Sequence, residues 1–132
     1  MELHIKAIEA ADVPKMDTAG KSDPFLTFQL STSSQKWKTK SKKNTATPVL
    51  NEEFHLPITS SMNDELTIKL YDDDDVSKDD IISTKVFKVR EFPVGKVVDQ
   101  WYQFSPAAKV KTGGKVRLVF HLDKSGKPAF KS

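Results

Sequence analysis

The chain has 132 residues, the length of a single domain, and a formal net charge of +3. It contains no run of about 18 apolar residues, so a membrane-spanning helix is not expected. It also lacks cysteine and the basic, apolar, small-residue order of a signal peptide, so we expect a cytoplasmic location.

Apolar and polar residues alternate with a period of two in several short segments, which are taken here in chain order. Such alternation is typical of half-buried antiparallel strands, and no helical stripe interrupts it. The predicted strands are residues 3–8, 24–30, 36–41, 52–58, 66–70, 83–89, 100–104 and 115–122. Polar turns separate them, so the sequence predicts an all-β fold, an eight-stranded antiparallel β-sandwich.

Residues 71–80, YDDDDVSKDD, contain six of the 18 acidic residues. A run of like charge is commonly a solvated loop, and this alternative stays open. A cation site is favoured because the run directly follows a predicted strand, and because a second acidic loop, KMDTAGKSDP at 15–24, does the same. Two carboxylates about 4 Å apart repel by ~1 kcal/mol in water and ~4 kcal/mol at an effective dielectric of 20, so an ordered cluster needs a cation.

Calcium suits such a cluster because it accepts about 6–8 oxygen ligands in flexible geometry. Magnesium demands a stricter octahedron. Zinc is not expected, because the chain has no cysteine and its histidines, His4, His55 and His121, lie in three separate predicted strands. An EF-hand is excluded, because its sixth position, counted from Asp72, is Ser77 rather than the required glycine.

The motifs KMDTAGKSDPF, a lysine-rich strand, TPVLNEEF and LTIKLYDDDDVSKDDII follow one another along the chain. This order resembles the C2 domain, the calcium- and phospholipid-binding sandwich of conventional protein kinase C and the synaptotagmins, over residues 1–122. The resemblance implies a Greek-key sandwich. It also implies the permuted, type II connectivity, because a strand, GGKVRLVFHL, follows QWYQF near the end of the chain.

The resemblance also implies a calcium site formed by two loops, with two or three ions. The side chains implied as ligands are Asp17, Asp23, Asp72, Asp74 and Asp80. The backbone carbonyls implied as ligands are those of Met16, Asp73 and Ser77. The side chains of Asp73, Asp75 and Asp79 are expected to tune the charge of the site rather than to bind the ions.

The two acidic loops together hold eight acidic and three basic residues, a net charge of −5. Two calcium ions would bring this to −1 and three to +1, so calcium is expected to remove the repulsion from anionic phospholipid such as phosphatidylserine, whose oxygens an incompletely coordinated ion can then accept. The lipid-contacting tips implied by the resemblance are Thr18 and Val76, which are small, and the neighbouring Asp75 opposes anionic lipid. We therefore expect modest, salt-sensitive membrane binding.

The segment KWKTKSKK at 36–43 is a second candidate site. Its alternation predicts one face with Lys36, Lys38 and Lys40. One reading is an edge strand that lysines protect against aggregation. The other resembles the polybasic patch with which C2 domains bind phosphoinositide, and Phe25 and Tyr71 match its aromatic residues. Phe25 lacks the hydroxyl of the tyrosine common there.

The expected organisation is a domain at 1–122 and a flexible basic tail at 123–132. An enzyme is not expected, because no cysteine, glycine-rich phosphate loop or Ser-His-Asp order is present. Nucleic-acid binding is disfavoured because the acidic loops would repel phosphates. The alternative to a calcium-dependent membrane module is a protein-interaction scaffold, either calcium-independent or calcium-modulated. A monomer is expected.

Overall fold

The structure is a computed structural model that describes residues 1–132 apart from 17–19, 60–62, 74–79, 127 and 132. The described residues form nine strands and one short 3-10 helix. In chain order these elements are β1 (Glu2–Ala11), β2 (Pro24–Leu30), β3 (Trp37–Lys38), β4 (Val49–Pro57), β5 (Glu65–Asp72), β6 (Asp80–Lys88), η1 (Val89–Glu91), β7 (Val97–Gln103), β8 (Ser105–Pro106) and β9 (Lys115–Asp123).

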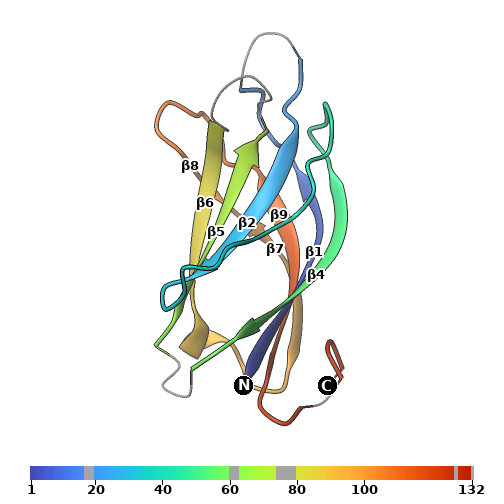
Figure 1. The fold of residues 1–132 in the computed structure, drawn as a ribbon. Helices are drawn as coiled ribbons and strands as arrows, with labels where there is room; N and C mark the ends of the chain where they lie inside the picture. Colours follow the sequence, from blue (N-terminus) through green and yellow to red (C-terminus); the bar gives the residue numbers. More distant parts are fainter. Residues whose placement is uncertain (17–19, 60–62, 74–79, 127, 132) are drawn as a thin grey trace.

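The strands form two antiparallel sheets that pack face to face (Figure 1). The first sheet has the order β4-β1-β9-β7 and the second the order β3-β2-β5-β6-β8. The last strand, β9, lies between β1 and β7, so the first and last strands of the chain are neighbours. This confirms the predicted Greek-key β-sandwich and its permuted connectivity.

The predicted number of eight strands is wrong by one. In the lysine-rich segment only Trp37–Lys38 pair with β2, so this strand is much shorter than predicted. The additional strand, β8, pairs with β6 through only two residues, and Pro106 has no N–H with which to extend the ladder. So short a strand leaves no alternation that a sequence could show.

The core between the sheets is built from the apolar residues of the alternating segments. Leu3 and Ile5 of β1 and Leu26 and Phe28 of β2 are fully buried. Burying a side chain of this size stabilises a fold by about 1.5–3 kcal/mol. The polar residues between them lie on the outer faces, which is why the outer faces are available for binding.

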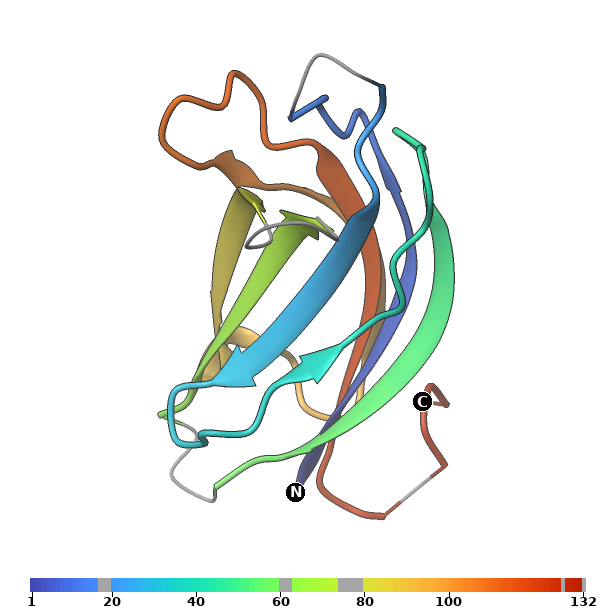
Figure 2. The same cartoon turned by 45° about the horizontal axis from the view of Figure 1, so that its top comes forward.

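Three strand ends that matter for function lie at one end of the sandwich. β2 begins there, β5 ends there and β6 begins there, at the top of Figure 1 and toward the viewer in Figure 2. The N-terminus lies at the opposite end in both views. The sheet register therefore places those predicted acidic ligands that lie within the described chain at a single end of the sandwich.

Candidate functional site

Three predicted calcium ligands lie on neighbouring strands. Asp23 immediately precedes β2, Asp72 is the last residue of β5 and Asp80 is the first residue of β6. Because β5 lies between β2 and β6, Asp72 pairs in register with Pro24 on one side and with Asp80 on the other. Asp23 precedes Asp72 by 49 positions and Asp80 by 57 positions in the chain, yet all three lie at one corner of the second sheet.

Hydrogen bonds lock the first two of these aspartates together. The backbone N–H of Asp23 donates to Oδ1 of Asp72 at 2.8 Å, and the N–H of Asp73 donates to the carbonyl oxygen of Asp23 at 2.9 Å. Asp72 is only 8 % exposed. A carboxylate this buried is tolerated because it accepts hydrogen bonds, and it is held at a fixed place beside Asp23.

Residues 41–44, at the end of the lysine-rich segment and directly after it, support this corner. The N–H of Asn44 donates to Oδ1 of Asp23 at 2.6 Å, and Nζ of Lys43 lies 3.6 Å from its Oδ2. The hydroxyl of Ser41 donates to Oδ2 of Asp73 at 2.6 Å. Sequence reasoning missed all three supporting residues, because contacts between two loops leave no periodic signal.

The other predicted metal residues are only partly within the described chain. Met16 is half-buried and packs against the core, and Asp80 is exposed. Asp17, Asp74 and Ser77, together with the predicted lipid-contacting tips Thr18 and Val76, lie outside the described residues. Within the described chain, no three His, Asp or Glu residues form a group that could hold a metal ion. The described part thus contains a fraction of the predicted ligand set.

The lysine-rich segment lies along the edge of the second sheet and continues the predicted alternation past the short β3. Its backbone follows β2 because the N–H of Thr39 donates to the carbonyl of Leu26 at 3.0 Å, and the Leu26 N–H donates back to Thr39 Oγ1 at 3.0 Å. Thr39 is buried in consequence. The lysines on either side of it, Lys36, Lys38 and Lys40, are exposed.

A further lysine, missed by sequence reasoning, joins this face. Lys69 of β5 pairs in register with Thr27 of β2, which also pairs with Lys38 of β3. Lys69 and Lys36 both line a hollow of about 220 Å³, whose other lining residues are mostly hydroxyl-bearing or amide-bearing. The alternation in LTIKL already placed Lys69 on a polar face, but only the register shows which lysines it joins.

The two aromatic residues of the predicted patch lie side by side. Phe25 and Tyr71 are register partners, and their rings stack with centroids 5.3 Å apart and planes 14° from parallel. Phe25 is 6 % exposed, whereas Tyr71 is half-buried. Tyr71 therefore offers more of its ring to a ligand than Phe25 does.

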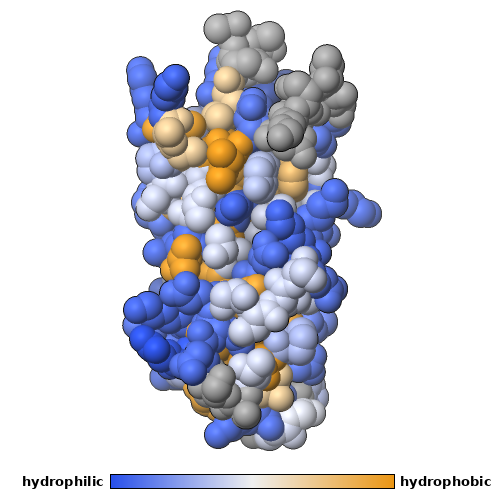
Figure 3. Space-filling view, turned by 60° about the vertical axis from the view of Figure 1, so that its left-hand side comes forward, coloured by the Kyte–Doolittle hydropathy of each residue, from blue (hydrophilic) through white to orange (hydrophobic). Residues whose placement is uncertain are grey.

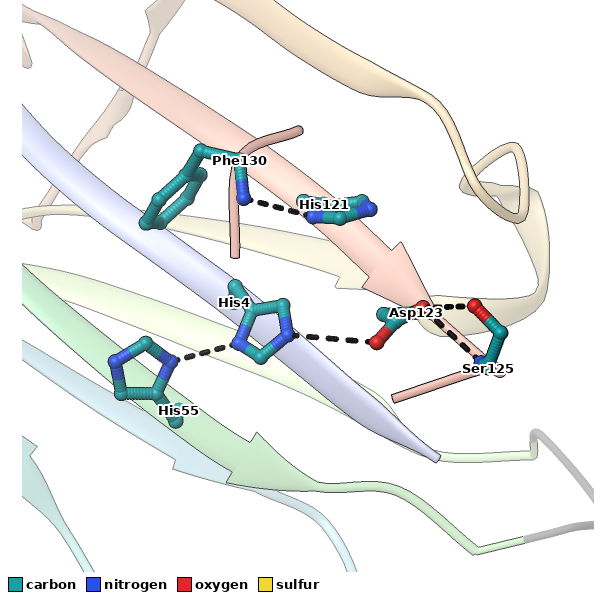
Figure 4. Close-up of polar contacts among 6 residues, drawn as sticks. All are labelled: His4, His55, His121, Asp123, Ser125 and Phe130. Atoms are coloured by element: carbon teal, nitrogen blue, oxygen red, sulfur yellow. Dashed lines mark hydrogen bonds and ion pairs between the residues drawn. The ribbon is translucent and has the colours of Figure 1, made fainter. Parts of the chain in front are cut away.

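The three histidines, which lie far apart in the sequence, meet on the first sheet (Figure 4). His4 of β1 is the register partner of both His55 of β4 and His121 of β9. Nδ1 of His4 lies 2.7 Å from Nδ1 of His55, which is a hydrogen bond and too short to admit a metal between them. The backbone N–H of Phe130 donates to Nδ1 of His121 at 2.9 Å, so part of the C-terminal segment lies over this cluster.

Burial, followed by the neighbouring imidazole of His55, lowers the pKa of His4 below its ordinary value of 6.5. Glu2 and Asp123 act in the opposite direction, and His121 adds to the lowering. Nε2 of His4 is buried with no hydrogen-bond partner within the described chain, and lies 4.0 Å from Oδ2 of Asp123. The cluster is therefore a structural feature of the sheet that favours neutral His4.

Comparison with known proteins identifies the family. The model of the C2 domain family matches residues 1–104, so this chain belongs to the C2 domain family. It is 34% identical over 105 residues to cytosolic phospholipase A2 delta of Mus musculus, a match that covers 79% of this chain and 13% of the relative. The chain thus spans only a small part of the length of that relative.

Two solved structures agree with this assignment. A C2 domain of plant Extended Synaptotagmin 1 superposes with a TM-score of 0.85 at 22% identity, covering 96% of each chain, and this shows the shared fold. The calcium-bound pair of C2 domains of Extended-Synaptotagmin 2 matches with a TM-score of 0.78 at 27% identity, covering 91% of this chain and 44% of the other.

The C2 domain family, to which the chain belongs, is in general a class of membrane-binding modules that are typically non-catalytic. No helix in the described ranges is long and apolar enough to cross a membrane.

Proposed function

We propose that this domain binds calcium at the end where β2, β5 and β6 meet, and that the bound ions attach it to anionic phospholipid membranes. The observation that carries the proposal is the joining of Asp23 and Asp72 by a 2.8 Å hydrogen bond, with Asp80 opposite Asp72 in register. The remaining proposed ligands are the side chains of Asp17 and Asp74 and the carbonyls of Met16, Asp73 and Ser77.

Electrostatics favour a hard divalent cation at this corner. Several carboxylates held close together repel one another, and within the described chain only one lysine, Lys43, lies within ion-pair distance of Asp23. Calcium accepts many oxygen ligands and tolerates irregular geometry, so two or three ions can share these loops. The calcium-bound state of the related Extended-Synaptotagmin 2 domains supports this choice of ion.

The lysine face is the proposed second contact with lipid. Lys36, Lys38, Lys40 and Lys69 present positive charge beside the Tyr71 ring. Each lysine near an anionic surface contributes about 1 kcal/mol, and the polar hollow beside Lys36 and Lys69 suits a phosphate-bearing headgroup. The partners are thus phosphatidylserine at the calcium loops and phosphoinositide at the lysine face. Phe25 contributes by holding Tyr71.

This function implies a cytoplasmic, monomeric module that moves to a membrane when calcium rises. The module carries no catalysis of its own in this proposal, and the activity of any longer protein that contains it is a separate question. Recruitment follows the sign of the charge at the loops, which calcium changes from negative toward positive.

A protein-interaction scaffold is the second candidate, and one observation favours it. β7 lies at the edge of the first sheet, and beside it is a groove of about 520 Å³ that Phe87, Phe92 and Tyr102 line together with Lys85 and Lys88. An edge strand next to an apolar, basic groove suits an extended acidic peptide. In this reading calcium has no effect on partner binding, or only modulates it.

Calcium titration calorimetry, with and without phosphatidylserine vesicles, tests the primary proposal. We expect saturable heat with calcium and a higher apparent affinity when the vesicles are present, because lipid oxygens complete the ligand set. Sedimentation with vesicles should require calcium and should fail with chelator or with magnesium in its place. A flat calcium titration, or equal sedimentation with calcium and with chelator, would contradict the proposal.

A further inference from the structure

The connection between β8 and β9 returns to the same end of the sandwich as the acidic residues. β8 runs antiparallel to β6, with Pro106 opposite Ser83, and the next N–H, that of Ala107, donates to the carbonyl of Ile82 at 2.9 Å. The chain therefore leaves β8 in the direction of Asp80, where β6 begins. Figures 1 and 2 both place this orange connection beside the loop that follows β1.

The loop after β1 and this connection enclose a hollow of about 390 Å³ between them. We call the residues that line it the basic hollow: Pro14, Lys15, Met16, Lys109, Val110, Lys111 and Thr112. Its three lysines are exposed, and among the residues that the structure describes no acidic one lines it. Met16 and Val110 are partly buried and pack against the core, so they form an apolar floor beneath the charges.

The backbone holds this connection in a defined shape. The N–H of Val110 donates to the carbonyl of Ala107 at 3.0 Å, which closes a turn in which Lys109 has a positive φ of 68°. Ser83 Oγ–H donates to the carbonyl of Gly113 at 2.7 Å. The lysines are thus presented from a fixed turn, and their placement costs less entropy on binding than that of a loose chain.

Surface hydropathy shows the same combination of properties. The upper end of the face in Figure 3 carries hydrophobic and hydrophilic surface side by side. Lysines above an apolar floor match a phospholipid, in which an anionic phosphate lies directly above apolar chains. The hollow also shares Met16 with the proposed calcium site, so a membrane that contacts one would meet the other.

We propose that the basic hollow binds the phosphate of an anionic membrane phospholipid, next to the calcium ions and independently of the lysine face. This inference rests on the proposed function, because it assumes that this end of the domain faces the membrane. Lys15 is already included in the net charge of −5 of the two acidic loops, and adding Lys109 and Lys111 brings the net charge of this end to −3. Two calcium ions then make this end positive, whereas the two acidic loops by themselves would need three.

The test compares Lys109→Gln/Lys111→Gln with a matched control, Lys96→Gln/Lys124→Gln. The control removes the same charge from two exposed lysines at the opposite end, near the end of β9. Binding to phosphatidylcholine vesicles with and without phosphatidylserine is measured in calcium and in chelator. Each lysine near an anionic surface raises the affinity for it about fivefold. The variant Lys109→Gln/Lys111→Gln, called the loop variant below, should therefore bind anionic vesicles at least about tenfold more weakly than wild type. The affinity of the control should stay within about twofold of wild type.

A labelled variant reports the contact directly, since the chain has no native cysteine. Ala108→Cys, exposed in the β8–β9 connection, should carry an environment-sensitive dye whose emission shifts to the blue on anionic vesicles. The same dye on Val94→Cys, exposed at the opposite end, should not shift. A blue shift at residue 94 but not at residue 108 would overturn the proposed orientation.

The outcomes separate this inference from the proposed function. Equal vesicle binding by the loop variant and the control, with wild type still dependent on calcium, overturns the basic hollow and leaves the proposed function intact. Wild-type binding that is the same in calcium and in chelator overturns the proposed function, and the loop variant measured in chelator then decides the inference. Absence of wild-type binding to anionic vesicles in either condition overturns both.

Discussion

Replacing Asp72 by asparagine should remove most of the stabilisation by calcium while leaving the calcium-free fold nearly unchanged. In the wild-type structure the N–H of Asp23 donates a hydrogen bond to Oδ1 of Asp72 at 2.8 Å, and the Oδ1 of an asparagine side chain can accept the same bond. The substitution removes the charge of a carboxylate that is only 8 % exposed and lies directly opposite Asp80. We expect the calcium-free stability to change by no more than about 1 kcal/mol, because carboxylate repulsion is relieved as the charge is lost.

The magnitude follows from ligand linkage. One calcium ion at about 100 times its dissociation constant stabilises the fold by about 2.7 kcal/mol. At an unfolding entropy of about 2.1 cal/mol/K per residue, this raises the Tm of a 132-residue domain by roughly 10 °C. If loss of the carboxylate weakens binding about 100-fold, the same calcium concentration adds only about 0.4 kcal/mol, or roughly 1.5 °C.

Thermal unfolding followed by circular dichroism, in chelator and in calcium, measures the calcium-induced shift in Tm for wild type and for Asp72→Asn. Asp12→Asn is the matched control, because Asp12 is an exposed acid in the loop after β1 and is not a proposed ligand. Its φ of 56° is one that asparagine adopts readily. A calcium shift in Asp72→Asn equal to that of wild type and of Asp12→Asn would refute the assignment of Asp72 as a ligand.

The described contacts support three other predictions. Lys36→Gln/Lys69→Gln should weaken binding to phosphoinositide vesicles roughly tenfold without changing the calcium titration, because within the described chain neither lysine is paired with an aspartate of the acidic corner. Gly113→Ala should destabilise the domain by about 3 kcal/mol or more in urea unfolding, since an added Cβ would lie 2.0 Å from the carbonyl oxygen of Phe104. Because burial lowers the pKa of His4, the unfolded chain binds more protons below about pH 6.5, and wild-type stability should fall as the pH drops from 7 toward 5. His4→Gln should make that fall shallower, and an unchanged slope would contradict the role of His4.

The alternating segments were sufficient to predict the sandwich, because a period of two leaves each strand one apolar face that must be buried. The segment at 36–41 shows the limit of this reasoning. The predicted alternation is present, because Trp37 and Thr39 are more buried than the lysines between and beside them. Thr39, however, contacts β2 through its hydroxyl as well as its backbone, and the regular pairing of strands ends at Lys38. Side-chain hydrogen bonds of this kind compete with regular pairing.

The candidate site was predicted in its residue types and not in its contacts. The resemblance implied Asp23 and Asp72 as ligands, but not that the backbone N–H of Asp23 donates to the carboxylate of Asp72. The histidines illustrate the same limit. His4, His55 and His121 were expected to lie apart, but strand neighbours are set by register, which brings together residues more than 100 positions apart.

The contacts of residues 41–43 have a thermodynamic consequence. Lys43 lies 3.6 Å from the carboxylate of Asp23, and Ser41 donates to Asp73, so the strand that bears the lysine face is fastened to the acidic corner. A calcium ion on Asp23 would compete with the ammonium of Lys43 for the same oxygen. An anionic headgroup that draws Lys43 away would, by the reciprocity of linked equilibria, raise the affinity for calcium by the same factor that calcium raises the affinity for the headgroup. The domain would then detect the coincidence of two signals rather than either one separately.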